Sequence, residues 1–242
     1  MLFPIGDDNS DRTRTPIVNY ALIIINILVF VFLQGLGRNA AFTYAYCTIP
    51  AEILTGKDIA DPSGIGVTPI PVYLTTITSM FMHGGYLHII GNMLYLWIFG
   101  DNIENRLGHS KYLIFYLLCG VIASLSHVFF TYFLGKDTMV PSLGASGAIS
   151  GVLGAYMLLF PKRKVHMLLL FRIPITVPSW IALGFWIGLQ IFSGIGTIGG
   201  KDDQVAYAAH IGGFIAGLLL IKFFDRGEPH DENKPFNLGW RN

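Results

Sequence analysis

Hydrophobic residues gather in six long runs, separated by shorter stretches rich in polar residues, glycine and proline. The runs cover roughly residues 17–35, 85–102, 112–134, 144–160, 177–195 and 205–224. A helix needs about 20 apolar residues to cross the hydrocarbon core of a bilayer. The pattern therefore predicts an all-α polytopic membrane protein with six transmembrane helices. Between the first two runs we expect short helices at the membrane surface.

The composition agrees with lipid as the main solvent. Of 242 residues, 52% are hydrophobic and 13% are charged, with a mean hydropathy of +0.55. Soluble domains usually carry about 25% charged residues. The net charge of +1 gives no case for a nucleic-acid partner. Cys47 and Cys119 have neither metal-ligand nor disulfide spacing, and HExxH is absent, so we expect no cofactor and no metal.

Basic residues are distributed unevenly between the two sides that six spans define. Twelve Lys and Arg residues fall on the side of the termini and four on the other. By the positive-inside rule both termini are then cytoplasmic. We expect a cytoplasmic segment 1–16, one membrane domain 17–224 and a cytoplasmic polar tail 225–242. A bacterial inner membrane fits this compact form, with a eukaryotic organelle as the alternative.

Ser146 stands at the outer end of the fourth run, among small residues that include Gly144 and Gly147. Small residues let membrane helices approach closely, so a serine on such a face can be incidental to packing. The soluble nucleophile elbow, GxSxG, needs a strand–turn–helix context, and the sequence does not predict that context here.

His210 makes a catalytic interpretation of Ser146 more attractive. Ionisable residues inside a membrane are costly and usually functional. With a helical rise of about 1.5 Å per residue, His210 and Ser146 lie at similar depth below the outer surface. Gly213 belongs to a small-residue face on the same run, so the two helices can pack closely. The alternative is a histidine bonded only to a backbone carbonyl.

The second run adds two polar side chains on one helical face, His88 and Asn92, which are four residues apart. Together with the Ser146 N–H they are suitable donors to an oxyanion in acyl transfer. Their alternative role is a polar clamp between helices. Because no Asp or Glu occurs between Ser146 and Lys201, we predict a Ser–His dyad rather than a triad with a carboxylate.

The residues discussed so far form three sequence motifs: GxSG at Gly144–Gly147, AHxxG at Ala209–Gly213 and HxxxN at His88–Asn92. As a set, and over nearly the whole chain, they resemble the rhomboid intramembrane serine proteases. The resemblance implies a rhomboid-like six-helix bundle. It makes Ser146 the nucleophile and His210 the base, with His88 and Asn92 lining an oxyanion hole beside Gly144.

Further residues match the family in structural roles. The stretch 100–108 resembles the end of the family's second helix, where Glu104 and Arg106 are structural, and His83 resembles a histidine that braces the first outer loop. The family's Trp-Arg pair is missing from that loop. Ser150 stands where the family often has a tyrosine stacked on the histidine. We therefore expect another aromatic ring or a hydrogen bond to orient His210.

The sequence thus predicts an intramembrane serine endopeptidase that cuts transmembrane protein substrates near the outer leaflet through an acyl-enzyme. Substrates would enter laterally past the fifth helix. One alternative is a pseudoprotease that only binds membrane helices, although such relatives tend to lack the serine or histidine. Another is a small transporter or channel, but the inner halves of the fourth and sixth runs are apolar.

Overall fold

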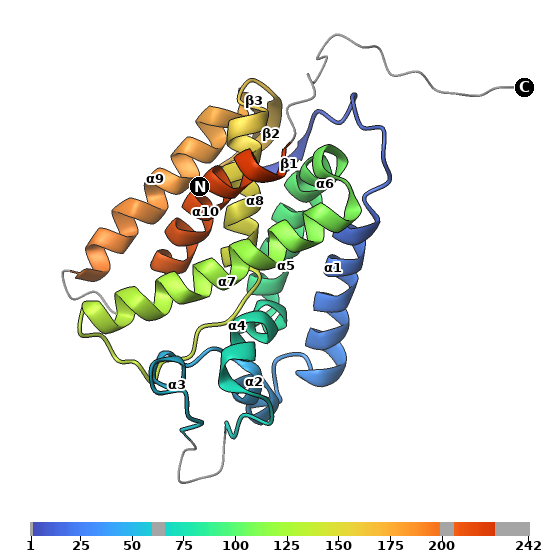
Figure 1. The fold of residues 1–242 in the computed structure, drawn as a ribbon. Coiled ribbons are helices and arrows are strands. Elements are labelled where there is room, and N and C mark those ends of the chain that lie inside the picture. Colours follow the sequence, from blue (N-terminus) through green and yellow to red (C-terminus); the bar gives the residue numbers. More distant parts are fainter. Residues whose placement is uncertain (1, 60–65, 199–205, 226–242) are drawn as a thin grey trace, which may run out of the picture.

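The computed structural model describes residues 2–59, 66–198 and 206–225 (Figure 1), so the predicted tail beyond Asp225 lies outside the described residues. Long helices form at all six predicted runs. They are α1 (Ile17–Leu28) with the π-helix η1 (Val29–Leu33), the continuous stretch α5 (Tyr86–Tyr95), η4 (Leu96–Gly100) and α6 (Asp101–Leu107), then α7 (His109–Phe133), α8 (Ser146–Leu159), α9 (Ser179–Ile198) and α10 (Tyr207–Phe224).

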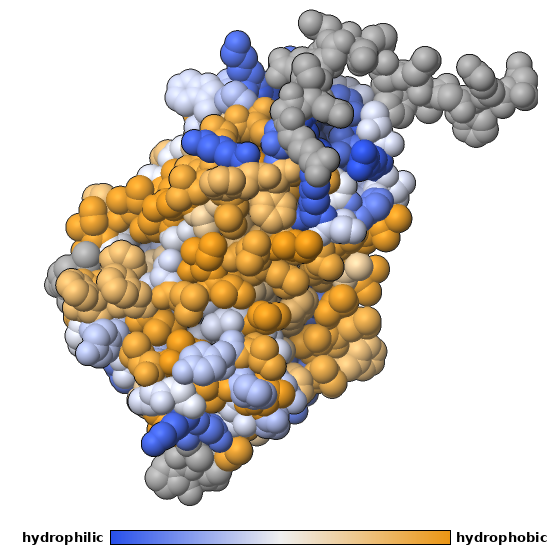
Figure 2. All heavy atoms as spheres, in the orientation of Figure 1, coloured by the Kyte–Doolittle hydropathy of each residue, from blue (hydrophilic) through white to orange (hydrophobic). Residues whose placement is uncertain are grey.

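Short helices follow α1, as expected for the first loop. They are α2 (Ala40–Tyr46), α3 (Pro50–Thr55), η2 (Val72–Leu74), α4 (Thr75–Thr78) and η3 (Ser79–Phe81). Among the described residues, α7, α10 and Ser179–Gly196 of α9 are long and apolar enough to cross a membrane, while Ile17–Leu33 and Ser146–Leu159 are apolar but shorter. Figure 2 shows apolar side chains around the middle of the molecule and polar ones at its two ends.

The prediction of an all-α protein was wrong at one end of the molecule. There β1 (Leu2–Asp7), β2 (Lys164–Leu169) and β3 (Ile173–Pro178) form an antiparallel sheet in the order β1-β2-β3. In β2 the buried Val165 and Met167 alternate with more exposed residues, as a half-buried strand requires. The hairpin β2–β3 begins in the basic stretch Lys162–Lys164, whose residues count toward the basic side of the chain. The remaining strand of the sheet, β1, comes from the opposite end of the chain, so local pattern could not reveal the pairing.

Helices α8 and α10 pack backbone to backbone through glycines. A Cβ atom on Gly213 would lie 2.1 Å from the Gly147 carbonyl oxygen, and one on Gly217 would lie 1.9 Å from that of Gly151. Neither contact leaves room for a methyl group. The two helices are therefore as close as helix backbones allow, which is the role of small residues between membrane helices.

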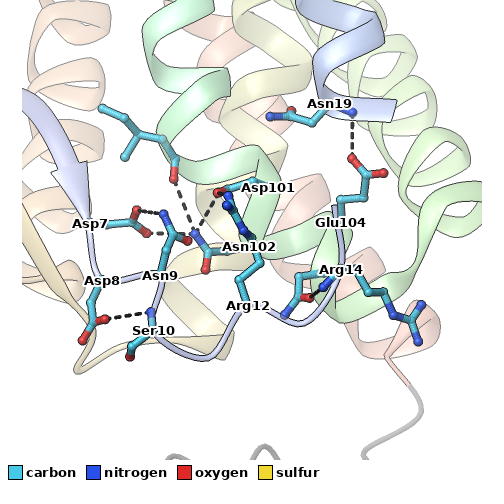
Figure 3. Close-up of polar contacts among 12 residues, drawn as sticks. Asp7, Asp8, Asn9, Ser10, Arg12, Arg14, Asn19, Asp101, Asn102 and Glu104 are labelled. Carbon is cyan, nitrogen blue, oxygen red and sulfur yellow. Dashed lines mark hydrogen bonds and ion pairs between the residues drawn. The ribbon is translucent and has the colours of Figure 1, made fainter. Parts of the chain in front are cut away.

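Helix α1 is fixed to the α5–η4–α6 stretch by buried polar contacts (Figure 3). The Asn19 side-chain amide donates to the Leu96 carbonyl oxygen in η4 at 2.9 Å, and the Tyr112 hydroxyl donates to Asn19 Oδ1 at 2.7 Å. Glu104 accepts the backbone N–H groups of Val18 and Asn19 at 2.9 and 2.7 Å. These contacts supply partners for groups that a π-helix and a helix start leave without intrahelical bonds. Hydrogen-bond partners for backbone groups matter most where water is absent.

Asp7 at the end of β1 links the sheet to the helices (Figure 3). Its carboxylate accepts hydrogen bonds from Asn102 Nδ2 at 2.9 Å and from Asn9 Nδ2 at 3.1 Å. It also accepts one from the Tyr156 hydroxyl. Burial raises the pKa of Asp7 to about 7, although the bond from Tyr156 and the nearby Arg163 favour the charged form. Asp7 therefore changes charge near neutral pH at the point where the strand meets the bundle.

Docking of β1 should weaken as the pH rises from 3.8 toward about 7, because the folded state favours a protonated Asp7 relative to its ordinary pKa of 3.8. Asp7→Asn should flatten this dependence. The measurement is amide hydrogen exchange of β1 and β2 between pH 5 and 8, corrected for intrinsic rates. Asp8→Asn is the control, because Asp8 is exposed and its pKa is lowered. Equal pH profiles for wild type and Asp7→Asn would contradict the prediction.

Gly213→Ala should lower the free energy of unfolding in detergent by about 1–3 kcal/mol, the usual cost of overpacking a tight contact. Gly188→Ala on α9 is the control, since no neighbouring heavy atom lies within 4 Å of its Cβ position. That variant should melt at or slightly above the wild-type temperature, because alanine favours helix. Equal melting of the two variants would show that α8 and α10 separate without cost.

Candidate active site

Ser146 is the first residue of α8, and hydrogen bonds to the segment between α1 and α5 hold the residues that precede it. Gly144 has a φ of +119°, a conformation that favours glycine. Its N–H donates to the Ser79 carbonyl oxygen at 2.8 Å, and Ser142 exchanges two backbone hydrogen bonds with Thr48. The start of α8 is therefore fixed by residues of the segment between α1 and α5, far away in sequence.

His210 lies in the first turn of α10, directly opposite Ser146. The Ser146 hydroxyl oxygen is 2.8 Å from His210 Nε2, and both side chains are half-buried. The glycine contacts between α8 and α10, with Gly147 facing Gly213, hold the two helix ends at this separation. At hydrogen-bond distance, a neutral imidazole can accept the serine proton.

Two side chains of α9 orient His210, and sequence analysis predicted neither. His210 Nδ1 is 2.8 Å from Gln190 Oε1, and the Trp186 ring centroid is 5.9 Å from that of His210. Ser150 takes no part, because its hydroxyl donates to the Ser146 carbonyl oxygen at 2.6 Å. Both a hydrogen bond and an aromatic ring are thus present. The sequence feature that could have indicated Gln190 is that it is a polar amide within the fifth apolar run.

His88 and Asn92 face the segment that precedes Ser146. The Gly84 N–H donates to His88 Nδ1 at 3.3 Å, which places the His88 proton on Nε2 in a neutral ring. A Cβ on Gly144 would lie 2.7 Å from His88 Nε2 and 3.6 Å from Asn92 Nδ2. Two N–H donors therefore point to the space left by the missing side chain of Gly144.

His83 joins this group from the loop before α5. Its Nε2 is 3.0 Å from Asn92 Nδ2, so the Asn92 amide donates to it. The His83 backbone is clamped by Gln34 at the end of η1, with bonds of 2.9 and 3.0 Å. His83 thereby connects the end of the first long helix to Asn92.

Glu104 and Arg106 do not join the site. Arg106 makes a bidentate ion pair with Asp225 at 2.9 and 3.0 Å, at the end of α10, and Glu104 caps α1. Twelve residues of helix separate Glu104 from Asn92, or about 18 Å of rise. Within the described ranges, no three His, Cys, Asp or Glu side chains are grouped to hold a metal ion.

A cavity of about 130 Å³ lies between α9 and the α5–η4 stretch. Its walls are apolar, with Tyr95 and Phe99 on one side and Leu183 and Trp186 on the other, and Pro4 of β1 is also part of the lining. Trp186 thus lines this cavity and also lies beside the His210 ring.

Comparison with known proteins identifies the family. The rhomboid domain model matches residues 72–226. The mitochondrial Rhomboid protein 1 of Saccharomyces cerevisiae is 32% identical over 208 residues, 86% of this chain and 53% of its own length. The rhomboid protease GluP of Bacillus subtilis is 32% identical over 207 residues, 85% of this chain and 35% of its own length.

A further relative is the mitochondrial presenilin-associated rhomboid-like protein A of Danio rerio, 34% identical over 151 residues, 62% of this chain and 37% of its own length. This chain thus spans about half or less of the length of these three curated relatives. Its match to the domain model nevertheless covers more than half of the chain itself. The chain belongs to the rhomboid family, whose fold is a helical bundle in the membrane.

Proposed function

We propose that this chain is an intramembrane serine endopeptidase with Ser146 as nucleophile and His210 as base. The observation that carries the proposal is the 2.8 Å separation of Ser146 Oγ and His210 Nε2 at the ends of two apolar helices. Family membership supports it, because the relative GluP is named a rhomboid protease.

The chemistry follows from this geometry. His210 Nε2 takes the Ser146 proton as Oγ attacks the scissile carbonyl carbon, which forms a tetrahedral intermediate. His210 then gives that proton to the leaving amine, the C–N bond breaks and an ester to Ser146 remains. A water molecule, deprotonated by His210, attacks the ester, and the proton returns to Ser146 as the acid leaves.

Negative charge on the carbonyl oxygen would be stabilised by donors at Gly144. His88 Nε2–H and the Asn92 amide reach this space, and the first N–H groups of α8 add the positive end of a helix. These groups are already fixed by Gly84 and His83, so little reorganisation accompanies the reaction. Gly147 and Gly213 support the site by keeping α8 against α10.

In the membrane, the six helical stretches would be six spans of a domain covering 17–224, with residues 1–16 and the tail from 225 in the cytoplasm. The ion pairs of Arg12, Arg106 and Arg163 lie at the end opposite Ser146, which agrees with a basic cytoplasmic face. The dyad then opens to the outer aqueous phase, which supplies water. We propose the bacterial inner membrane as the location, and the mitochondrial relatives make an organelle membrane the alternative.

Substrates would be transmembrane proteins that reach the dyad laterally, between α9 and α5. The apolar cavity there supports this route, as does α9, whose Phe185 and Phe192 are exposed. A peptide bond within a helix is protected by its own hydrogen bonds. The substrate must therefore unwind locally, which Gly or Pro near the scissile bond would promote.

Purified protein in detergent should cleave a generic membrane-spanning substrate. Ser146→Ala and His210→Ala should each lower the rate by roughly 10³-fold or more, because the two residues act as a unit. A fluorophosphonate should label the wild-type protein at Ser146. Ser150→Ala is the matched control and should keep its activity, since the Ser150 hydroxyl donates to a backbone carbonyl of its own helix. A folded protein with neither cleavage nor labelling would favour the helix-binding pseudoprotease.

Gly144→Ala should reduce kcat by about 10²-fold, as loss of an oxyanion donor does, because the new methyl group occupies the space in front of His88 Nε2. Gly91→Ala on α5 is the control, with nothing within 4 Å of its Cβ position. Cleavage rates and thermal unfolding of both variants make the comparison. If the folded Gly144→Ala variant keeps the wild-type kcat, His88 does not stabilise the oxyanion.

A further inference from the structure

We propose that Gln190 is a positioning residue that holds His210 in the tautomer required for catalysis. The inference rests on the proposed function of Ser146 and His210. Its starting point is the 2.8 Å contact between Gln190 Oε1 and His210 Nδ1, on the side of the ring opposite Ser146.

An imidazole that serves as a general base must be neutral, with its lone pair directed at the proton it takes. A neutral histidine carries one N–H, on either Nδ1 or Nε2. An amide oxygen at Nδ1 accepts the N–H there and so leaves the Nε2 lone pair for the Ser146 hydroxyl. The reverse tautomer would direct an N–H at Ser146 and would abolish base catalysis.

In many serine hydrolases a carboxylate makes this contact. Here α5, α7, α8, α9 and α10, the helices around the dyad, contain no Asp or Glu. The titratable groups that face His210 are His88 of α5 and His127 of α7. Of the described side chains, Gln190 is the one whose oxygen accepts from His210 Nδ1. It orients the ring without adding a charge to an apolar site.

Trp186, one turn before Gln190 on α9, lies beside the same ring, with the ring centroids 5.9 Å apart and the planes tilted by 38°. A ring contact and a hydrogen bond together fix both the position and the rotation of the imidazole. Both come from α9, whereas Ser146 and His210 come from α8 and α10. The base is therefore aligned when α9 packs against α10, and it loses its orienting contacts when α9 moves away.

The test compares Gln190→Leu, Gln190→Glu and the control Ile191→Leu, which changes the next, exposed residue of α9. Gln190→Leu should lower kcat about 10- to 10²-fold, a part of what a general base contributes, with little change in KM. Gln190→Glu should retain activity at high pH. Its carboxylate favours the imidazolium, so the acid limb of the kcat/KM profile should move up by about one pH unit or more.

A second measurement does not depend on turnover. Nitrogen-15 chemical shifts of the His210 ring, assigned with a His210→Gln variant, should report a protonated Nδ1 in the wild-type protein. Gln190→Leu should shift the tautomer ratio toward protonated Nε2, whereas Ile191→Leu should leave it unchanged.

The outcomes separate this inference from the proposed function. If wild-type protein neither cleaves nor reacts with a fluorophosphonate, the proposed function fails, and the nitrogen shifts still report on the hydrogen bond. If wild-type protein is active and Gln190→Leu matches Ile191→Leu in kcat, pH profile and tautomer, the inference alone fails. Loss of activity that only follows loss of folded protein, with an unmoved profile in Gln190→Glu, would likewise overturn it.

Discussion

The contact between α8 and α10 is the constraint on which the rest of the site depends. Lipid provides no hydrophobic force to bring two apolar helices together, so close packing has to supply the attraction. Gly213 and Gly217 of α10 lie directly against the carbonyl oxygens of Gly147 and Gly151 of α8, which brings backbone against backbone. Ser146 and His210 extend from the same helix ends, and their 2.8 Å separation follows from this approach. A contact without glycine would hold the helices apart and separate the Ser146 hydroxyl from the His210 ring.

Away from this contact, polar side chains supply hydrogen bonds at positions that water does not reach. At one end, Asn19 supplies a donor to η4, Glu104 caps α1, and Arg106 fastens the end of α10 through Asp225. Helix α9 is held differently: at its start Ser179 is bonded to Phe160 and Arg163 next to the sheet, whereas Phe185, Leu189 and Phe192 further along are exposed. The contacts of Trp186 and Gln190 with His210 connect this part of α9 to α10.

Much of this could be predicted from local pattern. Apolar length located all six helical stretches, and small-residue spacing indicated that the helices bearing Ser146 and His210 pack closely. The sheet could not be predicted, because β1 pairs with a hairpin that is far away in the sequence. In addition, the basic residues of Pro161–Lys164 are already accounted for by the positive-inside rule. Gln190 was missed for another reason. A single amide in an apolar run has no periodicity, and its role arises only where α9 meets α10.

The position of Ser150 shows how one family can orient its histidine in different ways. The family often has a tyrosine four residues after the nucleophile, on the nucleophile's own helix. In this chain the hydroxyl of Ser150 is bonded to the Ser146 carbonyl oxygen, and the ring beside His210 is Trp186 of α9. The contacts that orient His210 thus come from α9 and not from α8. The glycine packing fixes α8 against α10, whereas the contacts from α9 depend on how that helix packs, so in the function proposed for His210 the alignment of its ring depends on α9.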